Sequence, residues 1–579
     1  MANNIYNSIQ KASSGLSASQ AGLNVTGQNI SNVNTEGYSR QRVELKSEAL
    51  TGNSMGYMGL GVSTEGAKRI YDDIIAKNLR GEKSLLEYYN NIETTLKSSE
   101  VYFNELEIGG GLGQALEDYF NAWSDLANTA PDDSAESQSK KEVVISTATV
   151  LTTQLNEASS GLSNERYDSN KRIAMYVDEI NNMAKEISTL NKDIISTESN
   201  GRVANELRDR RDLLLNNMSE LVDINTYENE DGAVSVFIGN NALVDGVVLN
   251  KLYLIEDKTN SNFYNIYWGN NQNGPSLDIT NNINAGKLKA ELDLRDQYLK
   301  SYLDRLNTLS ENLIFETNKL HSKGYGESFF TNLTSNNGVS SRDLELSKDR
   351  TMSNKINEGQ IVFSIFDING EFVGNRAIKV DPTKNSLSEI VEGINKDEKL
   401  PLKAGITGDN KLQIFTKEGY SFAIADDTTN LLAALQLNTF FDGTNSEDIK
   451  INNLIEQNTQ YLASHSILTK GDNTLARNIA HLKLTNIESL DNSTFEGYYT
   501  SLSTKVASDL SKTTSLKSTK EYSVNQLKLK LDEVAGVSLE EEFVNMIKFQ
   551  KAYEANARMI TTLDQMLDTI INNMGIVGR

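Results

Sequence analysis

The two ends of this chain carry matching seven-residue hydrophobic repeats, and this match constrains the fold more than any other feature. Near the N-terminus the repeat runs for nearly four heptads, through Ile5, Ile9, Ala12, Leu16, Ser19, Leu23, Thr26 and Ile30. Such spacing places one stripe along a single helix face. A second stripe runs from Leu539 through Phe543, Met546, Gln550, Tyr553, Ala557, Ile560, Leu563, Leu567 and Ile570 to Met574. We therefore expect the two ends to form an antiparallel helical pair.

The N-terminal stripe is unusual because it lacks charge. No residue from Ala12 to Thr35 is charged, and the positions off the stripe hold Ser, Asn, Gln, Gly and Ala. Soluble helices normally carry Glu and Lys on such faces. A buried hydroxyl or amide needs only a hydrogen-bond partner, whereas a buried charge must be well paired. The composition favours a helix that lies against copies of itself, loose in the free protein and ordered in a polymer. The alternative is that the two stripes contact only each other.

The stripes predict a seam between the terminal helices, with Leu16, Leu23 and Ile30 opposite Phe543, Ile560 and Leu567. Ser538 and Glu541, just after Gly536, predict a capping box at the start of the C-terminal helix. The full set of predicted seam residues is Ile5, Ile9, Leu16, Leu23, Ile30, Phe543, Met546, Tyr553, Ile560, Leu567 and Ile570.

The stretch NISNVNTEGYSRQ, residues 29–41, ends the uncharged stripe in an Asn/Gly turn and follows it with an aromatic ring and a cation. We expect the N-terminal helix to end here and the chain to turn toward the next domain. Tyr38 would anchor this corner by a buried ring and Arg40 by its forked donors. The alternative is a plain solvent loop. The predicted corner residues are Asn29, Asn32, Asn34, Gly37, Tyr38, Arg40 and Gln41.

Between the ends, further heptad-like stretches predict a bundle of helices beginning near Leu85, Ile173, Ala204, Leu292 and Leu502. Short β-rich runs lie at residues 233–238, 244–255 and 263–268, and residues 329–448 alternate strands with short helices. Within the latter segment, Asn369-Gly370 predicts a hairpin with a type I′ turn, and residues 386–395 predict a helix.

The predicted fold is mainly α with an inserted β-rich domain, a multidomain α+β chain in nested order. Three domains are expected: a terminal helical coiled-coil stem of residues 1–70 and 537–579; an elongated helical bundle of residues 71–328 and 450–536, with a small β region at about 226–285; and an inserted β-rich outer domain of residues 329–449.

Composition limits the class of function. The formal net charge of −23 argues against nucleic acid and against anionic membrane surfaces. The absence of cysteine excludes disulfides, thiolate metal sites and cysteine nucleophiles. No apolar run approaches the roughly 20 residues of a membrane span, so no membrane insertion is expected. The first thirty residues hold one charge, Lys11, and no apolar signal run. Export would therefore use a route without a cleaved signal peptide.

Residues suited to catalysis are scarce. The three histidines, His321, His465 and His481, have no short metal-binding spacing, and the chain lacks a Walker lysine, GxGxxG and GxSxG. We therefore expect no catalytic, cofactor or metal site and no enzyme activity. A hydrolase in residues 326–449 would have to work without His or Cys, although pairs of acidic residues remain possible there.

Both ends resemble the axial proteins of the bacterial flagellum. GQNISNVNTEGYSRQRVEL, beginning at Gly27, is similar to their N-terminal signature, in which many members have proline where Glu36 stands here. FVNMIKFQKAYEANARMITTLDQML, beginning at Phe543, is similar to the matching C-terminal signature. The interior blocks at residues 120–144, 204–224 and 286–325 resemble the hook–filament junction members of that family. Hook and distal-rod proteins should lack the second and third blocks.

The resemblance implies a structural component of the flagellum, required for filament assembly, that forms a helical ring of identical copies joining hook to filament. It implies contacts with the hook protein and with a second hook-associated junction protein. It also implies an export chaperone at the C-terminal segment, passage through the flagellar type III export apparatus, and a secreted, extracellular location on the flagellum. A hook or distal-rod protein is the alternative within the family. A flagellum-associated hydrolase or a secreted adhesin is the alternative of another class.

Overall fold

The computed structural model describes residues 2–48, 50–53, 56–59, 61–103, 111–129, 134–199, 202–270, 273–350, 352, 355–396, 400–465 and 472–573. The chain forms two compact units: one of residues 1–93, 168–293 and 512–579, and one of residues 94–167 and 294–511. We call them unit 1 and unit 2. Met574, the last predicted stripe residue, lies outside the described residues, as does the rest of the predicted stem to residue 579.

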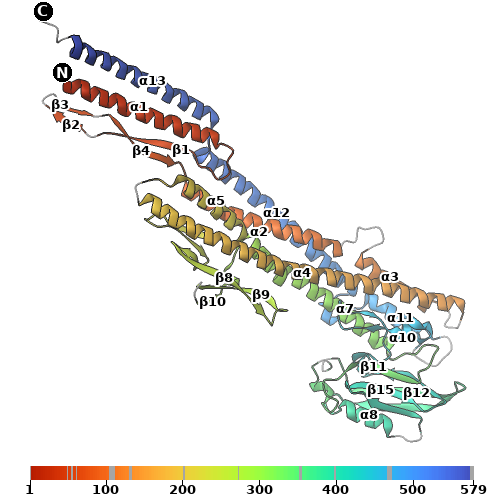
Figure 1. The fold of residues 1–579 in the computed structure, drawn as a ribbon. Helices are drawn as coiled ribbons and strands as arrows, with labels where there is room; N and C mark the ends of the chain where they lie inside the picture. The colour runs from red at the N-terminus through yellow and green to blue at the C-terminus, as the bar shows by residue number, and fades with distance from the viewer. Residues whose placement is uncertain are drawn as a thin grey trace, which may run out of the picture. The chain divides into compact units, whose positions relative to one another are not determined.

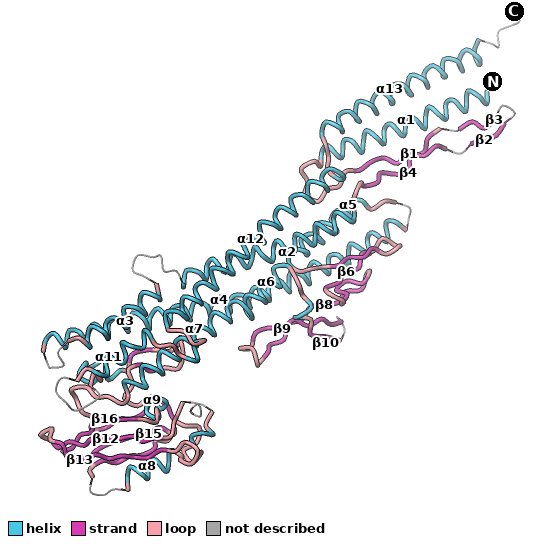
Figure 2. The backbone as a smooth tube through the Cα atoms, turned by 180° about the vertical axis from the view of Figure 1, so that it is seen from behind, coloured by secondary structure: helices cyan, strands magenta, loops and turns pink. Residues whose placement is uncertain are grey.

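Unit 1 contains the two terminal helices. Helices α1 (Ala2–Ser31) and α13 (Leu539–Asp568) run side by side, as both views show (Figures 1 and 2). The predicted antiparallel pairing of the chain ends is confirmed. Helix α1 also contacts a β-ribbon made of β1 (Gln41–Ser47) and β4 (Val62–Arg69), which the sequence did not predict. The ribbon continues into a hairpin of β2 (Leu50–Asn53) and β3 (Gly56–Gly59).

The remainder of unit 1 combines helices with one antiparallel sheet. The helices are α5 (Asn205–Leu221), α6 (Gly286–Asp293) and parts of α2 (Asp73–Glu100), α4 (Ala135–Glu198) and α12 (Phe495–Ala535), which continue into unit 2. The sheet has the order β10-β9-β8-β7-β6-β5. Its strands are β5 (Asn225–Glu228), β6 (Val234–Ile238), β7 (Asn241–Asp245), β8 (Val248–Asp257), β9 (Phe263–Asn270) and β10 (Gly274–Asp278).

The core of this part of unit 1 lies between α4, α5 and the sheet. The predicted stripe residues Ile173, Val177, Ile180, Ala184 and Ile187 of α4 are all at most 1% exposed and contact buried side chains of β6 to β9. The helical period of four and three residues therefore identified the buried face of α4 correctly. It did not predict the full length of α4, which begins at Ala135, well before the predicted stretch.

Unit 2 holds α3 (Leu112–Ala127), α7 (Leu299–His321), α10 (Asn453–Gln457) and α11 (Thr474–His481). A π-helical turn at Leu294–Tyr298 leads into α7. Trp123 and Tyr119 of α3 lie against Phe440, with ring centroids 5.4 and 6.0 Å away, and all three rings are fully buried. This aromatic cluster joins α3 to the chain that leaves the β-rich segment.

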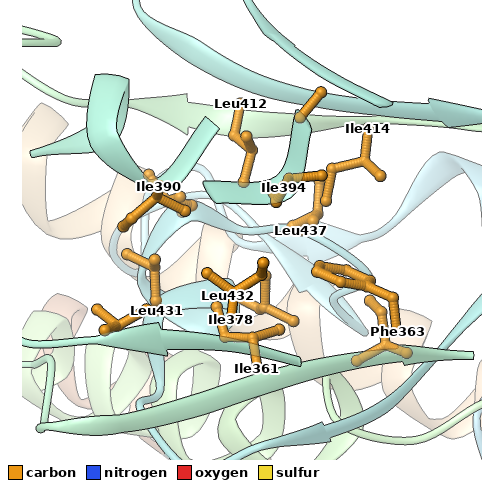
Figure 3. Close-up of a cluster of buried hydrophobic side chains, with 14 of the residues drawn as sticks. Ile361, Phe363, Ile378, Ile390, Ile394, Leu412, Ile414, Leu431, Leu432 and Leu437 are labelled. Carbon is orange, nitrogen blue, oxygen red and sulfur yellow. The ribbon is translucent and has the colours of Figure 1, made fainter. Parts of the chain in front are cut away.

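The β-rich segment of unit 2 has two three-stranded antiparallel sheets, β11-β15-β14 and β13-β12-β16. Its core lies between them, closed by α8 (Leu387–Asn395) and α9 (Leu431–Leu435) (Figure 3). The strands are β11 (Asn332–Gly338), β12 (Gly359–Asp367), β13 (Phe372–Val380), β14 (Leu402–Ile406), β15 (Lys411–Thr416) and β16 (Tyr420–Asp427), followed by the short pair β17 (Phe441–Asp442) and β18 (Lys450–Ile451). The predicted α+β fold class is confirmed.

The predicted hairpin at Asn369-Gly370 exists, but its turn is not type I′. Type I′ needs left-handed backbone at both central residues. Here Gly370 has φ +79°, whereas Asn369 is not among the residues with positive φ. The Asp367 amide donates to the Glu371 carbonyl at 2.9 Å, so the loop has three residues. The Asp367 carboxylate accepts from the Asn369 amide at 2.9 Å and holds that residue in a right-handed turn.

Candidate assembly site at the paired chain ends

The contact between α1 and α13 is built on small residues of α1, spaced seven apart. A Cβ placed on Gly15 would lie 2.8 Å from Asn556 Nδ2, and one on Gly22 would lie 2.6 Å from the Phe549 ring. One heptad further along α1, Asn29 Nδ2 donates to Glu542 Oε2 at 3.1 Å. The partner positions on α13 also differ by seven and run in the opposite direction. A strict heptad register of antiparallel helices results.

Burial follows these small residues rather than the large apolar ones. Ala12, Ser19, Thr26 and Asn29 are at most 5% exposed, and Gly22 is also buried. The predicted seam residues of α1 are all half-buried: Ile5, Ile9, Leu16, Leu23 and Ile30. They border the contact and keep part of their apolar surface uncovered in the single chain.

On α13 the predicted seam residues differ in burial. Met546, Ile560, Leu567 and Ile570 are half-buried, and Tyr553 is 36% exposed. Phe543 is 51% exposed. The residues of α13 that contact α1 in this part are Glu542, which is 2% exposed, and Phe549, two turns further on. The apolar pattern missed this because the buried residue at that turn is a carboxylate.

The corner that follows α1 is a hydrogen-bonded network centred on Asn29. The Asn29 Oδ1 accepts from the Tyr38 hydroxyl at 2.8 Å and from the Gln41 amide at 3.0 Å. Its Nδ2 donates to the Gln41 carbonyl at 2.9 Å, in addition to Glu542. One side chain, 1% exposed, therefore fixes the end of α1, the start of β1 and the start of α13.

Arg40 provides the charged part of the corner. Its Nε donates to Glu542 Oε1 at 2.8 Å and its Nη1 donates to Glu541 Oε2 at 2.7 Å. The Arg40 amide donates to the carbonyl of Ala535 at the end of α12, at 3.0 Å. Ser538 caps α13 by accepting from the Glu541 amide, but the Glu541 carboxylate binds Arg40, so the predicted capping box is only half formed.

The corner also contacts α5. The Ser39 amide donates to Asp209 Oδ2 at 3.2 Å, and Arg69 of β4 donates to the other oxygen of that carboxylate at 3.1 Å. Burial, reinforced by the carboxylates of Asp209, Glu542 and Glu206, raises the pKa of Tyr38 to about 12, so its hydroxyl keeps the proton that it donates to Asn29. Burial also raises the pKa of Asp209.

The remaining predicted corner residues shape the turn. Asn32 Nδ2 donates to the Gln28 carbonyl at 3.0 Å and extends the end of α1. Gly37 has φ +79°, and a Cβ there would lie 3.2 Å from Leu213 of α5, so glycine suits both backbone and space. Asn34 is exposed. Sequence reasoning missed Glu542, Asp209 and Arg69, for which spacing gives no signal because they lie far from the corner along the chain.

The fully buried histidine of the described chain, His321, serves the structure. His321, which is fully buried, has Nδ1 2.9 Å from the Asn438 carbonyl and accepts from the Ala463 amide at Nε2. Both ring nitrogens therefore form hydrogen bonds with backbone groups. Among the residues that the structure describes, no group of three His, Asp or Glu side chains could hold a metal ion, and no helix is long and apolar enough to cross a membrane.

Three family profiles match the chain. The flagellar hook-associated protein FlgK helical domain matches residues 96–331. The flagella basal body rod protein profile matches residues 9–38, which span most of α1 and the corner, and the flagellar basal body rod FlgEFG protein C-terminal profile matches residues 531–574, which include α13. The two terminal matches thus fall on the two helices that the structure pairs.

Full-length relatives carry one name. Flagellar hook-associated protein 1 of Bacillus subtilis is 26% identical over 592 residues, covering 99% of both chains. The proteins of that name from Salmonella typhimurium and Escherichia coli are 26% and 24% identical and cover 97% of this chain. The flagellar hook junction protein FlgK from Burkholderia pseudomallei has a similar fold, with a TM-score of 0.51 over 79% of this chain and all of that one, at 15% identity.

Paired terminal helices that match rod-type profiles at both ends define an axial structural protein of the bacterial flagellum. Among such proteins, the helical-domain match and the relatives that align over nearly the whole length point to the hook-associated group. Over nearly its whole length the chain is similar to proteins named flagellar hook-associated protein 1, and its helical part matches the FlgK helical domain.

Proposed function

We propose that this protein forms the junction between the hook and the filament of the bacterial flagellum and is required for filament assembly. The observation that carries the proposal is the presence, in one chain, of both rod-type terminal helices and the FlgK helical domain between them. Hook and rod proteins, which share the terminal signatures, account for the ends alone. The role is structural, and no catalytic step is assigned to any residue.

We infer that copies of the chain assemble into a helical ring through their paired terminal helices. Two properties of α1 support this assembly. The helix carries no charge from Ala12 onward, and Leu16, Leu23 and Ile30 remain half-exposed beside the contact with α13. Apolar surface of this kind is covered when identical chains lie around one axis. The hook protein would be the neighbour on one side of the ring and a second junction protein the neighbour on the other.

Export through the flagellar type III apparatus, with a chaperone at the C-terminal segment, completes the proposal. Along α13 the apolar residues Val544, Ile547, Met559 and Met566 are 46–63% exposed, and such a helix needs cover before assembly. The proposed location is extracellular, on the flagellum. We further propose the division into terminal stem, helical bundle and inserted β-rich outer domain, with boundaries near residues 70, 328, 449 and 537.

Deletion of the encoding gene tests the function. Cells should keep their hooks, release the filament subunits into the medium and lose motility, and the full-length gene should restore filaments. Labelling of an epitope inserted in the exposed loop near Asn369 should give one band at the base of each filament. Normal filaments on the deletion strain, or label along the whole filament, would refute the proposal.

A further inference from the structure

A groove of about 330 Å³ opens on unit 1 between α1, β1 and α13. Val25, Val43, Ile70 and Phe549 give it an apolar floor, and Leu45, which is 51% exposed, lies at its edge. Arg42 also lines the groove. Unlike its neighbour Arg40, exposed Arg42 pairs with no acidic side chain in the part of the chain that the structure describes. The groove therefore offers apolar surface next to an available positive charge.

The opposite face of α13 carries the complementary pattern. Glu542, Asn545 and Phe549 line the groove, and Glu540, Val544 and Ile547 project from the other side of the same helix by the 3.6-residue period. Val544 and Ile547 are 63% and 58% exposed. Glu540 is exposed and forms no ion pair with any described residue. We call this row of side chains the ridge. It begins with the negative charge of Glu540 and continues with the apolar side chains of Val544 and Ile547.

Groove and ridge also match in length. Glu540 and Ile547 are seven residues apart on a helix, a rise of about 10 Å. Arg42 and Leu45 are three residues apart on a strand, also about 10 Å. Side chains three residues apart on a strand point to opposite faces, so Arg42 and Leu45 reach the groove from the two faces of β1. A ridge laid along the edge of β1 would bring Glu540 to Arg42 and Ile547 to the apolar end of the groove.

We propose that the ridge of one copy, formed by Glu540, Val544 and Ile547, occupies the groove of the next copy, with Glu540 paired to Arg42. This inference rests on the proposed ring and names its lateral contact. Because groove and ridge lie on opposite sides of α13, two copies cannot satisfy both surfaces reciprocally. The contact is heterologous and continues from copy to copy, as a ring or helical array requires.

Charge exchange tests the ion pair. Arg42→Glu and Glu540→Arg, each alone, should lower the number of filaments per cell about tenfold or more, because each places like charges together at an interface. The double variant should recover to within about threefold of the unchanged protein. Circular dichroism of each purified variant should match the unchanged protein. Single variants without effect, or a double variant no better than either single one, would overturn the proposal.

Cysteine cross-linking identifies the occupant, and the chain offers a background with no native cysteine. Flagella assembled from the Leu45→Cys/Ile547→Cys variant should give, after mild oxidation, a ladder of covalent multimers of this chain. Either cysteine alone should give none, and the matched control Leu45→Cys/Ala552→Cys, with the second cysteine at an exposed position on another side of α13, should give at least tenfold less. Cross-linking to another flagellar protein, or no ladder from assembled flagella, would reject a second copy as the occupant.

The outcome separates this inference from the proposed function. A deletion strain that keeps normal filaments would remove the function and, with it, the ring. A deletion strain that loses its filaments, together with charge exchanges that have no effect, would remove only the groove and ridge contact and leave the function standing.

Discussion

At the residue scale, the corner depends on side chains that each serve several elements. The side-chain amide of Asn29 forms hydrogen bonds with four groups: the Tyr38 hydroxyl, the Gln41 amide and carbonyl, and the Glu542 carboxylate. A buried donor or acceptor left without its partner costs roughly 1–3 kcal/mol. Shortening Asn29 would leave several such groups unpaired at once. The amide-rich composition of the N-terminal stretch therefore has a local structural reason here, besides the one that assembly provides.

Gly22 predicts a sharp steric effect. Gly22→Ala places a Cβ within 2.6 Å of the Phe549 ring, so α1 and α13 must separate or the ring must move. We expect filament number per cell to fall about tenfold or more, given costs of 1–3 kcal/mol for overpacked contacts. Gly27→Ala is the matched control, since nothing lies within 4 Å of its Cβ and alanine favours the helix. Rescue of Gly22→Ala by Phe549→Ala would show that the clash is with this ring.

His321 predicts a pH dependence of stability. Burial lowers its pKa from 6.5 to about 4, against the opposing effect of the hydrogen bond to Asn438. Between pH 6.5 and about 4, the unfolded chain therefore binds a proton at this imidazole that the folded chain does not bind. The stabilisation that neutral His321 provides is complete above pH 6.5 and is lost as the pH falls toward 4, by up to about 1.4 kcal/mol per pH unit.

Urea denaturation of the full chain between pH 7 and 4 measures this dependence. The contribution of His321 is the part of the slope that disappears in His321→Gln, which does not titrate. His481→Gln, which removes an exposed histidine, is the matched control for the substitution itself. Identical pH slopes for the original protein and for His321→Gln would contradict the assignment.

At the element scale, the sequence predicted those elements whose apolar residues repeat without interruption. The buried face of α4, the pairing of α1 with α13 and the helix α8 behind its Ser386 cap all follow from periodicity or capping. The β1–β4 ribbon was missed because its strands alternate charges on an exposed face, as at Arg42, Glu44 and Lys46, and only one end is buried. Apolar alternation therefore gave no signal.

The seam of α13 shows the same limit. Phe543 was predicted to face α1 because it lies on the apolar stripe, four residues after Leu539. The start of α13 is instead buried through Glu542 and its bonds to Arg40 and Asn29. A carboxylate is buried only when it is paired, and the pairing residues lie about 500 positions away in the chain. Hydrophobic spacing cannot find such a residue.

Leu23 tests the half-exposed face of α1. In a single chain Leu23 is only half-buried, so Leu23→Asp should change the helicity and thermal unfolding of the purified protein little. In the assembled ring the same carboxylate would be buried without a partner, at a cost of several kcal/mol. Filaments should be absent, and Leu23→Met, which keeps an apolar side chain of similar size, should restore them. Global unfolding of Leu23→Asp in circular dichroism would place α1 in the folded core instead.

At the scale of the whole molecule, the buried cores are better stabilised by apolar contacts than the terminal helical pair. The cores of unit 1 behind the sheet and of the β-rich segment consist of side chains that are almost entirely buried. The terminal pair has small residues at its contact and many apolar side chains half-covered or exposed. Ordering each residue costs roughly 1–2 kcal/mol in backbone entropy. A helical pair with so little apolar cover offsets that cost poorly until neighbouring chains add their own contacts.

Amide hydrogen exchange therefore distinguishes the two kinds of structure in one experiment. In the purified monomer, amides of α1 and α13 should exchange within seconds to minutes, while those of α4 between Ile173 and Ile187 stay protected for hours. In isolated flagella the terminal helices should become protected by a factor of about 100 or more, and α4 should change little. The gain should be largest at Leu16, Leu23 and Ile30 and smallest in the exposed turn at Asn34. Equal, strong protection of α1 in monomer and flagella would mean that the pair is stable by itself and that its uncharged face does not depend on neighbours.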